Sequence, residues 1–150
     1  MVWCDNIDYD IMLDTLKGIP FSEEYSQSLN TLILEMLHAY DYSNSTREDI
    51  LSAVIELTDW VRKNDTFSLP SVTTINHYQA IKRSRKLTVS EQADLYQLTE
   101  SPQEDEQIYV GAYLLLDSPV AATVHFSKLS PEEQSTFLGF PISHFMPNNH

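Results

Sequence analysis

Glycine is scarce in this sequence, with only three residues in 150: Gly18, Gly111 and Gly139. Antiparallel sandwiches and barrels need many tight turns, and tight turns favour glycine and asparagine. Three scattered glycines also cannot build a Gly-rich phosphate-binding loop, which makes nucleotide-dependent activity improbable. The hydrophobic fraction of 42% is nevertheless high enough for a buried core. The composition therefore favours a globular helical protein.

Cysteine and long apolar runs are also lacking. The single cysteine, Cys4, excludes an internal disulfide and makes a reducing compartment the default. Residues 1–10 contain neither the basic region nor the apolar region of a signal peptide. The apolar run over 110–116 is far shorter than the roughly 20 residues of a membrane span. We therefore expect a soluble, cytoplasmic protein.

Basic residues are few: nine Lys and Arg stand against 22 Asp and Glu, for a net charge of −13. Residues 1–61 carry a net charge of −10, residues 62–86 carry +5, and residues 87–150 carry −8. An acidic surface repels nucleic acid and anionic lipid and attracts basic proteins. We expect a basic protein partner, with neither nucleic-acid nor membrane binding. Solubility alone is the alternative explanation of this charge.

Apolar residues recur at spacings of three and four along much of the chain, which predicts amphipathic helices. Ser45 with Glu48, Thr88 with Glu91, and Ser130 with Glu133 match the capping box that begins a helix. Pro119 and Pro131 stand at permitted first positions of helices. The expected helices cover about 22–40, 46–63, 71–85, 88–98, 103–116, 119–127 and 131–138.

These patterns predict an all-α protein, because no stretch shows sustained strand alternation. We expect a single compact domain of about seven or eight short helices packed as helical hairpins. Its N-terminal half would cover residues 1–65, and its C-terminal hairpins residues 71–146. The segments share no signature at a fixed period, so a repeat array is not predicted.

No set of residues has the spacing of a catalytic or metal site. The histidines, at 38, 77, 125, 144 and 150, include no pair at i, i+4. Cys4 has no histidine beside it in sequence, and the nearby Asp5 and Asp8 would disfavour its thiolate. The motifs Gly-x-Ser-x-Gly and His-Glu-x-x-His are both absent. We therefore predict no catalytic residue, no metal and no cofactor, and a protein that acts by binding.

The partner-binding residues are expected among the acids. A first cluster of acids, within residues 5–14, shares a short segment with aromatic residues. Such a segment combines charge for steering with rings for anchoring. A capped, solvated helix start is the alternative for these positions. The predicted partner-binding residues are a first cluster, Asp5, Asp8, Asp10 and Asp14, and a second cluster, Glu104, Asp105 and Glu106. The acids of the 48–63 helix, Glu48, Asp49, Glu56 and Asp59, are the next candidates.

The bases Lys82, Arg83, Arg85 and Lys86 form the one basic cluster of the sequence. They could contact phosphates. The simpler explanation is structural, because bases near the end of a helix can pair with acidic flanks or with its carbonyl end.

Residues 79–146 resemble the helical immunity proteins of bacterial contact-dependent growth inhibition, a polymorphic-toxin system. The resemblance lies in the basic KRSRKLT link, the GAYLLLD helix, the FSKLSPEEQ cap and the FPISHF ending. These features cover a little under half of the chain and specify no catalytic or binding residue. The resemblance implies a protein that binds and neutralises a cognate toxin domain, often a tRNA-cleaving nuclease.

We therefore expect an immunity protein that occludes the active site of a basic nuclease, with carboxylates where RNA phosphate would otherwise sit. The alternative is an acidic regulatory or adaptor protein, for example a phage-encoded mimic of nucleic-acid charge, that binds a basic protein.

Overall fold

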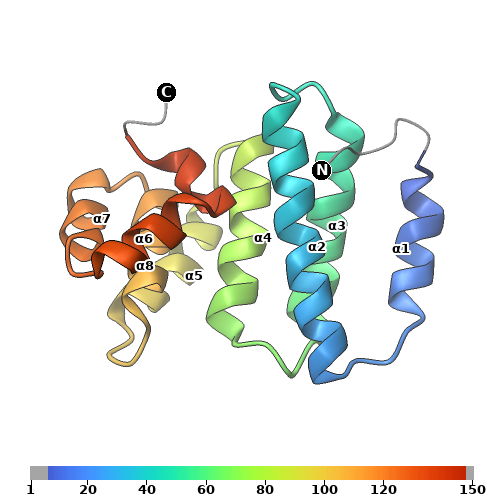
Figure 1. Cartoon of the computed structure of the whole chain (residues 1–150), viewed down its shortest axis with the longest axis horizontal. Coiled ribbons are helices and arrows are strands. Elements are labelled where there is room, and N and C mark those ends of the chain that lie inside the picture. The colour runs from blue at the N-terminus through green and yellow to red at the C-terminus, as the bar shows by residue number, and fades with distance from the viewer. Residues whose placement is uncertain (1–6, 148–150) are drawn as a thin grey trace. The chain divides into compact units, whose positions relative to one another are not determined.

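The computed structural model describes residues 7–147, and within this range the chain is helical and contains no strand (Figure 1). The predicted all-α class is therefore confirmed. The elements are α1 (Tyr9–Lys17), α2 (Glu23–Tyr42), α3 (Glu48–Asn64), α4 (Pro70–Ser84), α5 (Val89–Glu100), α6 (Glu106–Leu115), α7 (Pro119–Phe126), α8 (Pro131–Leu138) and the 3-10 helix η1 (Pro141–Phe145). Among these helices, none combines the length and the apolar character needed to cross a bilayer.

The chain divides into two compact units, Met1–Ser84 and Arg85–His150. The first unit holds α1 to α4, which run in alternating directions (Figure 1). Its central helix is α3, which packs against α1, α2 and α4. The expected C-terminal hairpins over residues 71–146 include α4, but α4 packs on α3 and α2 within the first unit.

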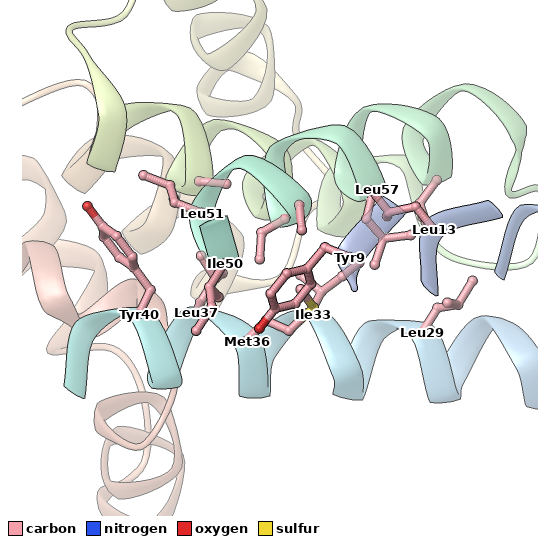
Figure 2. Packing of buried hydrophobic residues seen from close by; sticks show 14 residues of the cluster. Tyr9, Leu13, Leu29, Ile33, Met36, Leu37, Tyr40, Ile50, Leu51 and Leu57 are labelled. Atoms are coloured by element: carbon pink, nitrogen blue, oxygen red, sulfur yellow. The ribbon is translucent and has the colours of Figure 1, made fainter. Parts of the chain in front are cut away.

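The core of the first unit lies between α1, α2 and α3, where apolar side chains from the three helices point toward one another (Figure 2). The predicted stripe of α2 supplies Leu29, Ile33, Met36, Leu37 and Tyr40, all buried. The stripe of α3 supplies Ile50, Leu51, Ala53, Val54, Leu57 and Val61. Tyr9 and Leu13, four residues apart, place one side of α1 on this core.

Two of the three predicted capping boxes are formed. The hydroxyls of Thr88 and Ser130 accept from the N–H groups of Glu91 and Glu133 at 3.2 and 3.1 Å, and both glutamates return the bond. These bonds satisfy amide groups that have no partner inside the helix.

The capping box predicted for Ser45 and Glu48 is wrong. Asn44 and Ser45 adopt left-handed backbone conformations with φ of 56° and 63°, which close the turn after α2. This turn moves the N-cap of α3 to Arg47, and Arg47 makes no side-chain capping bond. Asparagine, as at position 44, tolerates that conformation better than most residues.

Polar side chains form a buried network between α2 and α4. The Asn76 amide donates to Asn30 Oδ1 at 2.7 Å, and the Gln79 amide donates to Asn76 Oδ1 at 3.2 Å. One turn further along α4, the Arg83 guanidinium forms a two-pronged ion pair with Asp41 at 2.8 Å for both bonds. The Arg83 side chain is only 1% exposed, so the carboxylate replaces the solvation that its charge loses.

In the second unit, α6 packs against α5, α7 and η1, and η1 also contacts α8. The Phe126 and Phe137 rings meet edge to face, with their centroids 5.8 Å apart. The Gln134 amide donates to the carbonyls of Phe126 and Leu129, which links α8 to the end of α7 and to the loop that follows it. The buried apolar side chains of α5 to η1 are Leu95, Val110, Ala112, Leu114, Leu115, Ala122, Leu129, Phe137 and Ile142.

Truncation of Leu51 to alanine should lower the free energy of unfolding by about 2–5 kcal/mol, because Leu51 is 1% exposed at the centre of the first core. Ile55 lies on the same helix but is only partly buried, so Ile55→Ala should cost clearly less. Urea unfolding of both variants measures the difference. Equal losses would show that the inward face of α3 is assigned incorrectly.

Candidate functional site

An open groove of about 380 Å³ lies between α1 and α3 in the first unit. Its lining combines apolar or small side chains with four carboxylates drawn from two segments about 40 residues apart in sequence. The lining residues are Ile7, Asp8, Tyr9, Asp10, Leu13, Asp49, Ser52, Ala53 and Glu56. Because Tyr9 and Leu13 turn inward to the core, Asp8 and Asp10 are left exposed along the groove.

Two of the groove carboxylates are paired with bases. Asp49 accepts from the Arg47 guanidinium at 2.9 and 3.0 Å, and this hydrogen bonding lowers the pKa of Asp49 below its ordinary value. Glu56 accepts from Lys17 Nζ at 3.2 Å. Both pairs lie near the surface, where an ion pair contributes little to stability and exchanges partners at low cost.

The other two carboxylates, Asp8 and Asp10, form no ion pair with any residue in the range 7–147. Asp8 is the N-cap of α1, and its Oδ1 accepts from the Ile11 N–H at 3.1 Å. Asp10 stands in the first turn, where the positive end of the helix dipole favours a negative charge. The groove therefore keeps a net negative charge beside an apolar floor.

The structure brings part of the first predicted cluster together with part of the acids of the 48–63 helix. Asp8 and Asp10 share the groove with Asp49 and Glu56, whereas Asp14 is exposed on α1 and does not line it. Asp5 lies outside the described residues. In the sequence, residues 5–14 and 48–59 are separate candidates, and only the packing of α1 on α3 makes them one site.

The second predicted cluster, Glu104, Asp105 and Glu106, lies in the second unit at the start of α6. Glu106 is engaged inside that unit, with Oε2 2.7 Å from His125 Nδ1 on α7. The His125 ring stacks on Tyr113 at 5.4 Å between centroids and also contacts Tyr109. Glu106 therefore links α6 to α7, and Asp105 is the N-cap of α6 without a side-chain capping bond.

The basic cluster at residues 82–86 holds two structural ion pairs. The helix α4 ends at Ser84, and the arginines on either side of that residue reach different partners. Arg83 pairs with Asp41 of α2, and Arg85 pairs with Glu91 of α5 at 2.7 and 2.8 Å. The pairing of both arginines with acids favours the structural explanation of this cluster over phosphate binding.

One group of neighbouring side chains superficially resembles a catalytic triad: Thr58, His77 and Asp59. Thr58 Oγ1 lies 3.0 Å from His77 Nδ1, and His77 Nε2 lies 3.9 Å from Asp59 Oδ1. However, the Thr58 hydroxyl is 1% exposed and donates to the Val54 carbonyl at 2.8 Å. The Thr58 hydroxyl therefore bonds to its own helix backbone and is not accessible to a substrate. The geometry fits a structural contact between α3 and α4.

Among residues 7–147, no three or more His, Cys, Asp or Glu side chains are grouped so that they could hold a metal ion. Comparisons of the chain with protein-family models, curated proteins and solved structures found no match. The groove between α1 and α3 is therefore the candidate site on the grounds of its own charge and shape.

Glu91 should make the stability of the protein depend on acid pH. The Arg85 guanidinium, with help from the Thr88 cap, lowers the pKa of Glu91 to about 2 from an ordinary value of 4.5. A lowered pKa stabilises the folded state above the unfolded pKa, and this stabilisation is lost as the pH falls toward about 2. Glu91→Gln should therefore destabilise the protein at pH 7 and approach wild type near pH 2.

Urea unfolding midpoints measured from pH 7 down to pH 2 test this expectation. Glu100→Gln, which removes an exposed carboxylate at the other end of the same helix, is the matched control. A deficit of Glu91→Gln that stays constant over this pH range would contradict the assignment of the Arg85–Glu91 pair.

Proposed function

We propose that this chain is an immunity protein that binds a basic toxin domain, a (t)RNA-cleaving nuclease, and occludes its active site. The observation that supports the proposal is the acidic groove, in which carboxylates from two distant segments converge on one surface of a protein with a net charge of −13. The resemblance of residues 79–146 to helical immunity proteins points in the same direction.

Electrostatics supports such a partnership. A nuclease must bind an RNA backbone, so its cleft carries Lys and Arg side chains. A strongly acidic protein is attracted to that cleft from a distance, which raises the rate of association. Like-charged macromolecules, including RNA itself, are repelled. The net charge therefore favours a cationic partner over most other occupants.

The groove also suits the side chains that a nuclease cleft presents. Lys and Arg carry a charged head on an apolar stem, and the stem gains from contact with an apolar surface. The groove offers Leu13 and Ala53 beside the carboxylates of Asp8 and Asp10. Glu56 and Asp49 can exchange Lys17 and Arg47 for partner bases, because those pairs are near the surface.

If the groove receives the partner, its carboxylates should set the salt dependence of association. The double variant Asp8→Asn/Asp10→Asn removes two charges from the groove, and asparagine at position 8 still caps α1. We expect this variant to associate more slowly and to show a shallower fall in association rate as salt rises. The measurement is binding kinetics across a salt series, with a basic nuclease domain encoded immediately upstream as the partner.

The matched control is Glu100→Gln/Glu132→Gln, which removes the same charge from exposed positions outside the groove. An equal effect of both double variants would assign the steering to net charge and not to the groove. Survival of cells that express the toxin domain together with this chain tests neutralisation. Tight binding without rescue would support the regulatory or adaptor alternative, and a salt-independent association rate would leave the charge a role in solubility only.

A further inference from the structure

Three exposed apolar side chains lie at one end of the first unit, on the loops that join α1 to α2 and α3 to α4. Ile19 is 42% exposed, Phe67 53% and Leu69 61%. Figure 1 shows both loops at the same end of the four helices, on either side of the start of α2. These three residues are here called the apolar end. None of the three residues lines the acidic groove.

The loop that carries Phe67 and Leu69 is held in place by hydrogen bonds. Asp65 Oδ1 accepts from the N–H groups of Phe67 at 2.8 Å and Ser68 at 3.3 Å. Asp65 Oδ2 accepts from the buried Ser26 hydroxyl at 2.5 Å, and Ser26 also contacts the Ser68 hydroxyl at 2.5 Å. Burial opposes the ionisation of Asp65, but these hydrogen bonds outweigh it and lower the pKa of the carboxyl.

The other loop is held by aromatic contacts. Phe21 stacks on Trp60 of α3 with ring centroids 4.9 Å apart, and it also contacts Tyr25. The Tyr25 hydroxyl donates to the Leu16 carbonyl at 2.6 Å, which ties the end of α1 to α2. Both loops are therefore fixed by contacts that do not use the exposed side chains of the apolar end. Exposed side chains on a fixed backbone lose little conformational freedom when a partner covers them.

Carboxylates lie between the two loops. Glu23 and Glu24 occupy the exposed first turn of α2, directly after the Ser22 cap. A second copy of this chain docked through the same surface would bring these carboxylates close to their own counterparts, in a molecule that already carries −13. A partner with Lys or Arg around an apolar patch would instead pair with them. Charge complementarity thus selects a basic protein.

We propose that Ile19, Phe67 and Leu69 anchor a basic protein partner, whose contacting face carries apolar side chains next to Lys or Arg, as on a cationic amphipathic helix. The inference rests on the proposed function in that the partner is basic, but it assigns a second surface with a different role. The charge of the groove raises the rate of association. The apolar end lowers the dissociation rate, because a few well-buried side chains supply most of the binding energy of an interface and their loss acts mainly on dissociation.

Two synthetic peptides test the inference on the full chain. One is a cationic helix with leucines along one face and lysines elsewhere, and the other has every leucine replaced by serine. Chemical shifts of the isotope-labelled protein report where each peptide binds. The Lys/Leu peptide should shift the amides of Ile19, Phe67 and Leu69, and this binding should persist at high salt. The Lys/Ser peptide should shift groove amides only, and salt should abolish that binding.

Substitution provides a second readout. Phe67→Ser/Leu69→Ser should weaken the Lys/Leu peptide at least about fivefold, the loss typical of an interface anchor. The matched control is Val120→Ser/Val124→Ser, which removes two side chains of similar exposure, 79% and 52%, from α7. All four positions are exposed, so thermal melting of both variants should match wild type.

The inference is overturned if the Lys/Leu peptide does not bind, if its shifts map away from the apolar end, or if both double variants weaken it equally. The proposed function fails separately if the Lys/Ser peptide leaves the groove amides unshifted at low salt. If the Lys/Leu peptide still binds at the apolar end in that case, the inference about the apolar end stands and the groove is not a binding site.

Discussion

Burial of the apolar side of α3 is the interaction on which the first unit depends. This helix contacts α1, α2 and α4, so its buried residues hold each of the other helices in position. Two of its carboxylates, Asp49 and Glu56, line the groove beside α1. Its last turn leads into the Asp65 loop, which presents Phe67. Loss of core contacts on α3 would therefore disturb both proposed binding surfaces, and the groove shares Tyr9, Leu13 and Ala53 with the core directly.

The same packing explains why the surface is so strongly charged. Helices with one buried side leave their other positions free of packing constraints, and in this chain those positions are filled with Asp and Glu. Crowded carboxylates repel one another and reduce stability. Local pairs such as Lys17–Glu56 and Arg47–Asp49 relieve part of that repulsion. A bound cationic partner would relieve more of it.

Local patterns predicted α2 to α8, because spacing and capping act over a few residues, but α1 was not among the expected helices. Most residues of the α2 and α3 stripes are buried, although Leu32 and Ile55 are only partly so, and the caps at Thr88 and Ser130 are found as expected. The Ser45 cap failed because a left-handed turn after α2 overrides the local motif. The pairing of Arg83 with Asp41, 42 residues away, and the joining of Asp8 with Asp49 depend on which helices pack together. Sequence spacing does not encode those contacts.

The buried polar contacts between α2 and α4 have an evolutionary consequence. Apolar packing tolerates small slides of one helix along another, whereas Asn30–Asn76 and Asp41–Arg83 are satisfied in one register only. A slide by one helical turn, about 5.4 Å, would separate Arg83 from Asp41 and Asn76 from Asn30, and would leave Arg83 its bonds to Gln79 on the same helix. These positions can therefore change only in concert: a homologue that loses Asp41 should also have lost Arg83, while neighbouring leucines and valines drift singly.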